Sequence, residues 1–119
     1  FQYHSKLLLT NKMTQHLVKF GVVTDVQYAD NNNAPAWYDP RKTRYYRNAL
    51  YQVHSAFQHW NQEEREEGTI KTEFVIQLGD IIDGINRKSS HEASLKALRK
   101  TLEQFEINPH IPTFHAVGK

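Results

Sequence analysis

Three short apolar runs alternate with two amphipathic stretches along the chain. The runs span residues 17–26, 74–78 and 111–117, are rich in β-branched residues, and each stops near a polar residue or a glycine. Runs of this kind are typical of interior strands of a parallel sheet. The pattern therefore predicts the order strand, helix, strand, helix, strand, with right-handed crossovers and an α/β fold.

The first amphipathic stretch predicts a long helix that begins at Pro40, with Asp39 as its N-cap, and ends at Gly68. We expect the acidic run at residues 63–67 to be solvated. The apolar residues of this helix recur at helical spacing and form one stripe. The stripe consists of Tyr46, Ala49, Leu50, Val53, Phe57 and Trp60.

The second amphipathic stretch predicts a helix capped by Ser89 together with Glu92 and stopped by Asn108 and Pro109. Its inward residues are predicted to be Leu95, Leu98, Leu102 and Phe105. Turn-forming residues predict loops at 30–40 and 79–88. Residues 1–16 are predicted to be a polar N-terminal lead, and the whole chain, 1–119, to be a single partial domain.

Composition narrows the classes of function. A length of 119 residues suits one domain, and a net charge of +2 is too small to favour non-specific nucleic-acid binding. Because the chain has no cysteine, disulfides and thiolate metal sites are excluded, so a metal would need oxygen or imidazole ligands. No apolar run approaches the roughly 20 residues that span a bilayer. We therefore expect no nucleic-acid or membrane partner and a cytoplasmic location.

Two carboxylates follow predicted strands and make a metal site the leading hypothesis. Asp25 lies at the end of the first strand, and Asp80 follows the second after Gly79, which permits a tight turn. Ligands of parallel sheets collect at the carboxyl ends of the strands. We expect Asp25 and Gln27 to reach one ion, because side chains two apart on an extended backbone share a side. Taken singly, an Asp after a strand is more often a helix cap or turn former.

Three segments together resemble the calcineurin-like metallophosphoesterases: Asp25-Val26-Gln27, Gly79-Asp80-Ile81-Ile82-Asp83-Gly84, and a third strand that ends in Gly118. The family has His where this chain has Gln27. That Gln resembles one branch, the manganese-dependent ADP-ribose/CDP-alcohol diphosphatases. The same branch is indicated by Tyr28-Ala29-Asp30, Arg44-Tyr45-Tyr46-Arg47-Asn48 and Gly84-x-Asn86. The resemblance implies the β-α-β-α-β portion of a two-sheet sandwich whose C-terminal half is missing.

The resemblance also implies metal ligands. Asp25 and Gln27 would bind one ion, and Asp80 would bridge two. A neutral amide oxygen in place of imidazole favours Mn²⁺, with Mg²⁺ as the alternative, over Zn²⁺. The seven histidines share no ligand spacing, and we expect them to be surface or packing residues.

Six further residues stay open between a functional and a structural role. Asp83 supports the Gly79–Asp80 turn, hydrogen-bonds a metal-binding group or caps a helix, and Asn86 either approaches substrate phosphates or forms a loop. Trp37 and Tyr38 either stack on a nucleobase or pack beneath their loop. The remaining two, Arg44 and Arg47, either pair with phosphate or pack a helix start.

The function implied is hydrolysis of the phosphoanhydride in nucleoside-diphosphate-linked small molecules such as ADP-ribose or CDP-choline, by an enzyme that is a monomer when full length. The family has Asn and His after the position of Gly118, whereas Lys119 follows here. No catalytic residue is therefore expected in this chain, and it is expected to be truncated and inactive or weakly active. The alternatives are a non-catalytic nucleotide- or partner-binding remnant, or a phosphodiesterase or phosphomonoesterase of the same superfamily.

Overall fold

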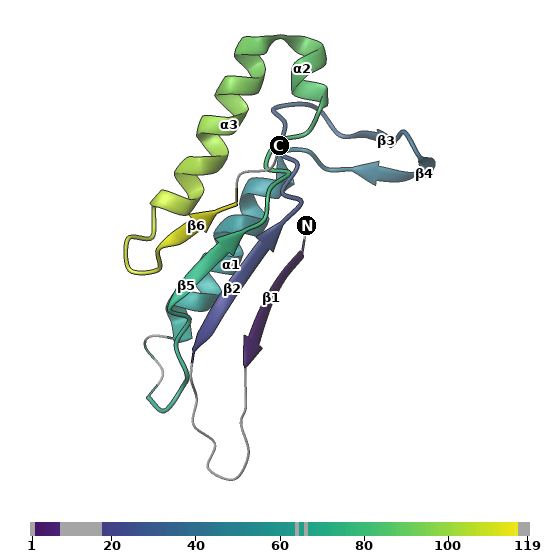
Figure 1. The fold of residues 1–119 in the computed structure, drawn as a ribbon. Coiled ribbons are helices and arrows are strands. Elements are labelled where there is room, and N and C mark those ends of the chain that lie inside the picture. The colour runs from purple at the N-terminus through teal and green to yellow at the C-terminus, as the bar shows by residue number, and fades with distance from the viewer. Residues whose placement is uncertain (1, 8–17, 64, 66, 117–119) are drawn as a thin grey trace.

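The computed structural model describes residues 2–7, 18–63, 65 and 67–116 (Figure 1). Its strands and helices, in chain order, are β1 (Gln2–Leu7), β2 (Lys19–Thr24), β3 (Ala34–Ala36), β4 (Asp39–Arg44), α1 (Asn48–Glu63), β5 (Phe74–Gln77), α2 (Ile85–Ser89), α3 (His91–Glu106) and β6 (Thr113–His115). Among these residues, no helix has the length and apolar character needed to cross a bilayer.

The main sheet has the strand order β1-β2-β5-β6. The neighbours β2, β5 and β6 are parallel, which agrees with the predicted β-α-β-α-β order. The prediction of a polar lead at residues 1–16 is wrong for Gln2–Leu7, because these residues form β1, antiparallel to β2. An edge strand is held by backbone hydrogen bonds and need not show an apolar period, so the sequence pattern gave no signal for it.

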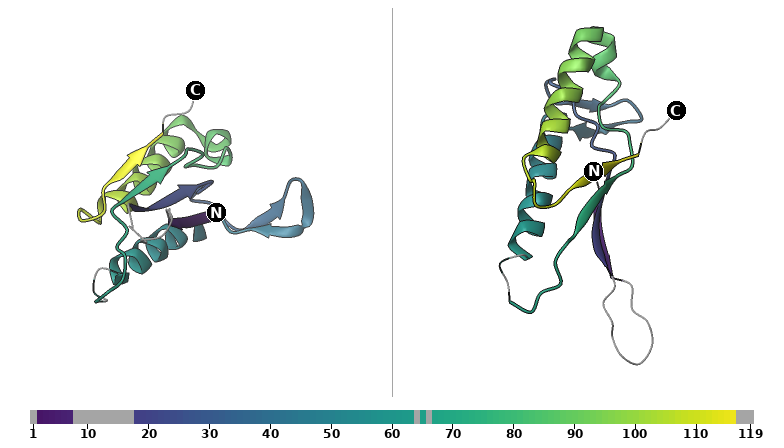
Figure 2. Two further views of the ribbon diagram at one scale, coloured as in Figure 1. Left: turned by 60° about the horizontal axis from the view of Figure 1, so that its bottom comes forward. Right: turned by 60° about the vertical axis from the view of Figure 1, so that its left-hand side comes forward.

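Both long helices pack on one face of this sheet (Figure 2). The buried core joins Val23 and Val75 of the sheet to Phe57 and Trp60 of α1 and Phe105 of α3. Phe57 contacts Trp60 and Phe105 edge to face, with ring centroids 5.2 and 5.8 Å apart. The first predicted apolar stripe therefore lies in the core from Ala49 onward, as predicted.

The close approach of α1 to β2 depends on a glycine. A Cβ atom on Gly21 would lie 2.5 Å from the Trp60 ring. Since Trp60 is fully buried, its ring has little room to move away. Gly21 therefore lets the largest side chain of the core lie directly on the strand that leads to the predicted site.

The predicted helix start at Pro40 and the predicted loop at 30–40 are both wrong. Residues 34–44 form the β3–β4 hairpin, and α1 begins at Asn48. Asp39 caps no helix; its carboxylate accepts hydrogen bonds from the backbone N–H and the guanidinium of Arg41. Strand β4 offers no apolar stripe that a helix could bury, so pairing with β3 is favoured over helix extension.

The far end of α1 also differs from the prediction. The helix ends at Glu63, and Gly68 lies beyond it in a turn with φ of +81°. Glu63 is buried rather than solvated: Thr72 Oγ1 donates to its carboxylate at 2.8 Å, and Lys19 forms an ion pair with it. A buried charge needs such partners, and these partners come from residues distant in sequence.

The structure corrects two predictions for the segment between β5 and β6. The predicted loop at 79–88 includes the short helix α2, and the cap of α3 is Ser90, whose Oγ accepts the Ala93 N–H at 2.9 Å; Ser89 is the last residue of α2. The buried residues of α3 are Ala97, Thr101 and Phe105, whereas Leu95 is 42% exposed. The buried stripe thus lies along a different line from the leucines.

The third strand is shorter than predicted. It covers Thr113–His115, and the fully buried Ile111 precedes it. Val117 and Gly118, which the sequence placed at the strand end, lie outside the described residues.

Candidate functional site

The three predicted metal ligands share an unusual backbone conformation. Asp25, Gln27 and Asp80 have φ of 54°, 48° and 52°, and they account for the positive-φ non-glycine residues in the described part of the chain. Residues with a Cβ rarely adopt this region and keep it only where the surroundings impose it. Backbone strain is therefore concentrated at the ends of β2 and β5, where the sequence predicts the site.

The period-two argument for Asp25 and Gln27 is wrong. Strand β2 ends at Thr24, and the left-handed conformation of both residues breaks the alternation of an extended chain. Backbone hydrogen bonds join the two segments instead: Gln27 N donates to Asp80 O at 3.1 Å, and Tyr28 N donates to Ile81 O at 3.1 Å. The loops that follow β2 and β5 therefore run side by side past the sheet.

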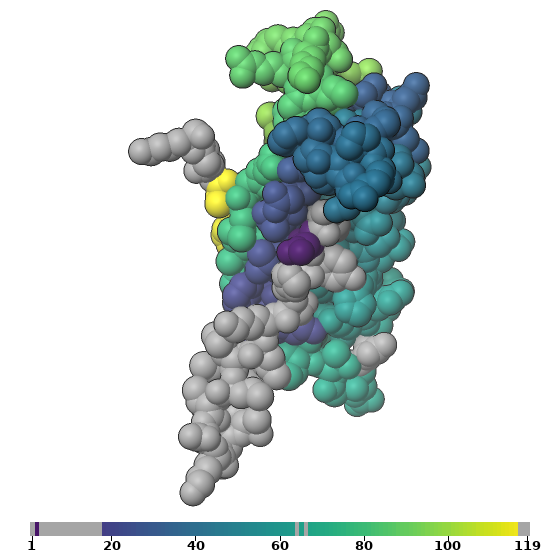
Figure 3. Space-filling view, turned by 90° about the vertical axis from the view of Figure 1, so that its right-hand side faces the viewer, coloured from purple at the N-terminus to yellow at the C-terminus, as the bar shows by residue number. Residues whose placement is uncertain are grey.

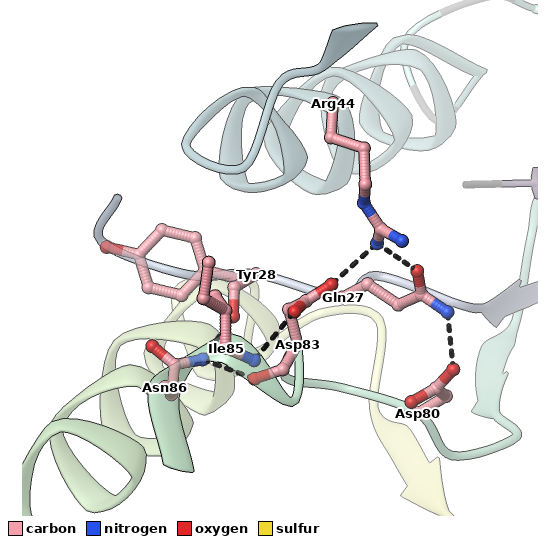
Figure 4. Close-up of polar contacts among 7 residues, drawn as sticks. All are labelled: Gln27, Tyr28, Arg44, Asp80, Asp83, Ile85 and Asn86. Carbon is pink, nitrogen blue, oxygen red and sulfur yellow. Dashed lines mark hydrogen bonds and ion pairs between the residues drawn. The ribbon is translucent and has the colours of Figure 1, made fainter. Parts of the chain in front are cut away.

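A chain of side-chain hydrogen bonds crosses this pair of loops (Figure 4). Gln27 Nε2 donates to Asp80 Oδ2 at 2.6 Å. Arg44 Nη2 donates to Gln27 Oε1 at 2.5 Å and to Asp83 Oδ2 at 2.6 Å. Because Arg44 is the last residue of β4, the hairpin is tied to the loops that carry the predicted ligands.

Two cavities adjoin this network. The first, of about 390 Å³, is lined by Asp25, Gln27 and Arg44, and the second, of about 350 Å³, by Gln27, Arg44, Asp80 and Asp83. Asp25 and Asp80 are both exposed, and Thr24 Oγ1 donates to Asp25 Oδ2 at 2.9 Å. The two carboxylates are thus open to solvent, with Gln27 and Arg44 between their cavities.

The donors at this site are two carboxylates and one amide, a set that suits hard cations such as Mn²⁺ or Mg²⁺. In the described residues, no group of three or more His, Cys, Asp or Glu is arranged to hold a metal. Gln27 would therefore have to contribute. Its oxygen faces Arg44 and its nitrogen faces Asp80, so the amide must turn before its oxygen can meet a cation at Asp80.

Among the described residues, the Asp83 side chain hydrogen-bonds neither the Gly79–Asp80 turn nor a predicted metal ligand, and the N-cap of α2 is Gly84. One carboxylate oxygen pairs with Arg44, and the other accepts the Ile85 N–H at 2.8 Å at the start of α2. Asn86 is 5% exposed, and its Nδ2 donates to the carbonyls of Tyr28 and Asp83 at 2.8 Å each. The Asn86 amide nitrogen is thus used within the loop, and Asn86 lines neither of the two cavities beside Asp25 and Asp80.

The aromatic pair lies on the β3–β4 hairpin, which stands beside α2 (Figure 3). Trp37 and Tyr38 are 87% and 58% exposed and contact each other edge to face, with centroids 5.7 Å apart. These exposures contradict the alternative in which they pack beneath the loop. Trp37 also lines the second cavity, together with Asp80.

Arg47 lies three residues after Arg44, directly before α1. Its Nε donates to Asp30 Oδ1 at 2.7 Å, and Lys100 Nζ lies 3.7 Å from the same carboxylate. The hydrogen bond from Arg47 and the charge of Lys100 lower the pKa of Asp30 below its usual value. Arg47 therefore fixes the loop after Gln27 and has a partner already, which weakens its case as a phosphate ligand.

The sequence prediction omitted two residues near the site. Lys88, on α2, lines the cavity that contains Asp80, and no ion pair of Lys88 is found among the described residues. Gln77 is fully buried at the end of β5, and its Nε2 donates to the Gly79 carbonyl at 2.8 Å. The sequence did contain a signal for Gln77, because it is a polar residue within an apolar run and lies just before Gly79 and Asp80.

The histidines are placed as expected for surface or packing residues where the structure describes them. His54 and His59 are exposed on α1, and His59 lies 3.6 Å from Glu63. His115 packs its ring edge-on against Phe105, with centroids 5.3 Å apart.

Comparison with known proteins gives consistent similarities. No protein-family profile matches the chain. It is 38% identical over 104 residues to the manganese-dependent ADP-ribose/CDP-alcohol diphosphatase of Xenopus laevis, and 35% over 105 residues to that of Homo sapiens. These alignments cover 87% and 88% of this chain but 27% and 28% of the relatives, so the chain spans under a third of their length.

A solved structure is also similar. The crystal structure of a dimetal phosphatase from Danio rerio matches with a TM-score of 0.67 and 32% sequence identity. The match covers 83% of this chain and 28% of that chain. The observed α/β arrangement therefore corresponds to part of a dimetal phosphatase fold.

Proposed function

Starting from the fact that the chain resembles part of the manganese-dependent ADP-ribose/CDP-alcohol diphosphatases over most of its length, we propose that it forms the metal-binding portion of a metal-dependent phosphohydrolase. The substrates proposed are nucleoside-diphosphate-linked small molecules, with ADP-ribose and CDP-alcohols as the representatives that the names of the relatives suggest. The bond cleaved is the phosphoanhydride.

One observation carries the proposal. The three residues that offer oxygen donors at the ends of β2 and β5 are also the three non-glycine residues with left-handed backbone in the described part of the chain. Strain of this kind costs stability and persists at sites where the conformation is needed for function. A purely structural loop at these positions would be more stable with glycine or with an unstrained backbone.

The proposed roles follow from the geometry of the described residues. Asp25 and Asp80 present exposed carboxylates to a divalent cation, and Gln27 adds an amide oxygen once its side chain has turned. Arg44 neutralises Asp83 and keeps the two loops in register. Mn²⁺, when bound, polarises a phosphoryl group and lowers the pKa of a coordinated water.

The substrate class is supported by the second cavity. Its lining includes Asp80, the exposed Trp37 and Lys88. Stacking on an aromatic face accepts different bases, and a cation that makes no ion pair with another described residue suits a phosphate. The proposed orientation places the diphosphate toward Asp80 and the base toward the hairpin.

The test is a calorimetric titration of the chain with Mn²⁺, compared with Asp25→Asn and Asp80→Asn. Each substitution removes a charge from an exposed side chain, so we expect the fold to persist and the Mn²⁺ affinity to fall by about tenfold or more. Asp39→Asn is the matched control, because Asp39 pairs with Arg41 on the hairpin and faces neither cavity.

The outcomes separate the hypotheses. Mn²⁺ binding that depends on Asp25 and Asp80, but not on Asp39, supports the proposal. Equal affinities in all four proteins would overturn it and favour a nucleotide- or partner-binding module without metal chemistry. We expect slow turnover of ADP-ribose by this chain, because few protein ligands hold the ions and metal affinity depends on ligand number.

A further inference from the structure

Gln77 is an unusual residue for the end of a central strand. It lies on the same face of β5 as Val75, in the helix-covered core, and its side chain is fully buried. Its Nε2 donates to the Gly79 carbonyl at 2.8 Å, whereas its Oε1 has no hydrogen-bond partner within the described residues.

A buried amide with one unsatisfied end is costly to the fold. Replacing it by an apolar side chain of similar size removes the unpaired oxygen from the core but also removes the hydrogen bond to the Gly79 carbonyl, so the two effects on stability oppose each other. Stability alone therefore gives little reason for an amide at position 77. The role of the amide therefore rests on the hydrogen bond that it makes to the Gly79 carbonyl.

That hydrogen bond acts on the backbone of the ligand turn. Gly79 and Asp80 are consecutive left-handed residues, with φ of 99° and 52°. The Gly79 carbonyl belongs to the peptide group that joins these two residues, so fixing its direction fixes the orientation of the Asp80 backbone. The direction of the Asp80 side chain toward Gln27 and its cavity follows from that orientation.

We propose that Gln77 is a positioning residue for Asp80: by holding the Gly79 carbonyl from within the core, it imposes the left-handed turn that presents the Asp80 carboxylate to a divalent cation. This inference rests on the proposed function, in which Asp80 binds the metal. Gln77 itself is buried and touches neither metal nor substrate in this role.

Thr113 provides a matched control in the neighbouring strand. It is the register partner of Val75 in β6, and its Oγ1 is also buried without a hydrogen-bond partner in the described part of the chain. No hydrogen bond of its side chain reaches the Gly79–Asp80 turn. Thr113→Val therefore removes an unpaired core oxygen, as Gln77→Met does, but leaves the turn untouched.

The experiment measures two properties of the wild-type chain, Gln77→Met and Thr113→Val. Urea unfolding gives stability, and calorimetric titration gives the affinity for Mn²⁺. We expect Thr113→Val to unfold at an unchanged or higher urea concentration, and Gln77→Met to unfold close to the wild type, because the lost hydrogen bond to Gly79 offsets the removal of the unpaired oxygen. Only Gln77→Met should lose Mn²⁺ affinity, by about tenfold, the lower end of the range for removing groups that orient metal ligands.

The test is decisive because the loss of Mn²⁺ affinity is expected in Gln77→Met alone and without a matching loss of stability. Equal Mn²⁺ affinity of wild type and Gln77→Met would overturn the positioning role while leaving the proposed function intact. Absence of Mn²⁺ binding by the wild type would overturn both. Loss of affinity in Thr113→Val as well would also overturn the role, because a general core effect would then explain the result.

A measurement on the wild type keeps the inference testable if Gln77→Met fails to fold. The side-chain amide protons of Gln77 should exchange with solvent far more slowly than those of Gln58, which is exposed on α1. Addition of Mg²⁺, which is diamagnetic, should shift the Asp80 amide resonance. Fast exchange at Gln77, or no shift at Asp80, would contradict the proposal.

Discussion

Replacing Arg44 by Met tests the network that joins the hairpin to the two loops. The Arg44 side chain is 21% exposed and its Asp83 partner 14% exposed, so both charges are largely removed from solvent. A hydrogen bond to a charged group contributes about 1.5–3 kcal/mol, and removing one partner of a fully buried pair costs about 3–5 kcal/mol. With partial exposure, we expect the free energy of unfolding to fall by about 2 kcal/mol.

Arg41→Met is the control on the same strand. Arg41 pairs with Asp39 at 3.0 Å, but its side chain is 90% exposed. Exposed pairs contribute about 0–1 kcal/mol, and the two substitutions remove the same chemical groups. The difference between them therefore isolates burial and the second hydrogen bond, which Arg44 makes to Gln27.

Urea unfolding followed by circular dichroism measures both variants. For a small domain the m-value is about 1–3 kcal/mol/M, so the expected loss for Arg44→Met corresponds to a midpoint lowered by about 1 M. A double-mutant cycle with Asp83→Asn should give a coupling energy of about 1–2 kcal/mol. If Arg44→Met and Arg41→Met lie within about 0.5 kcal/mol of each other, the reasoning from burial is refuted.

Three further predictions concern other parts of the structure. Arg47 and Lys100 lower the pKa of Asp30, so the stability that they give the folded chain is complete above the pKa of Asp30 in the unfolded chain and is lost as pH falls through its pKa in the folded chain. Asp30→Asn should therefore lower the free energy of unfolding at pH 7 and flatten the acid limb of a stability–pH curve. An unchanged acid limb would contradict this. Trp37→Ala should leave the urea midpoint unchanged, because the side chain is 87% exposed, but weaken ADP binding in the presence of Mn²⁺ by about 1–3 kcal/mol; unaltered ADP affinity by calorimetry would remove Trp37 from the site. Gly21→Ala should destabilise the fold by about 1–3 kcal/mol, because the added methyl meets Trp60 at 2.5 Å, and an unchanged thermal midpoint would show that α1 moves away freely.

The order of strands and long helices could be predicted because burial leaves a period in the sequence. Val23, Val75 and Phe57 are apolar for the same reason that they lie in the core, so their spacing carries the fold. The β3–β4 hairpin carries no such signal, since β4 is charged and mostly exposed. Its formation depends on pairing with β3 and on local side-chain bonds such as that between Arg41 and Asp39.

The residues of the candidate site were proposed from the sequence, but their geometry was not anticipated. Asp25 and Asp80 follow apolar runs, which sequence reveals, whereas the left-handed backbone at these residues has no compositional mark, because only glycine signals that conformation. The contact between Gln27 and Asp80 joins positions 53 residues apart and depends on the pairing of two loops beyond the sheet. Arg44 was expected at a helix start and instead ends a strand, so its bonds to Gln27 and Asp83 could not be anticipated.

The shared hydrogen bonds of Arg44 have a consequence for the sequence of binding events. One terminal nitrogen of Arg44 serves both Gln27 and Asp83. If a cation draws the Gln27 oxygen toward Asp80, that nitrogen loses one acceptor and keeps a donor turned toward the space between the cavities. The Arg44 guanidinium would then be available to an anion only after the cation has bound. Binding would therefore be ordered, with the metal first and the phosphate second.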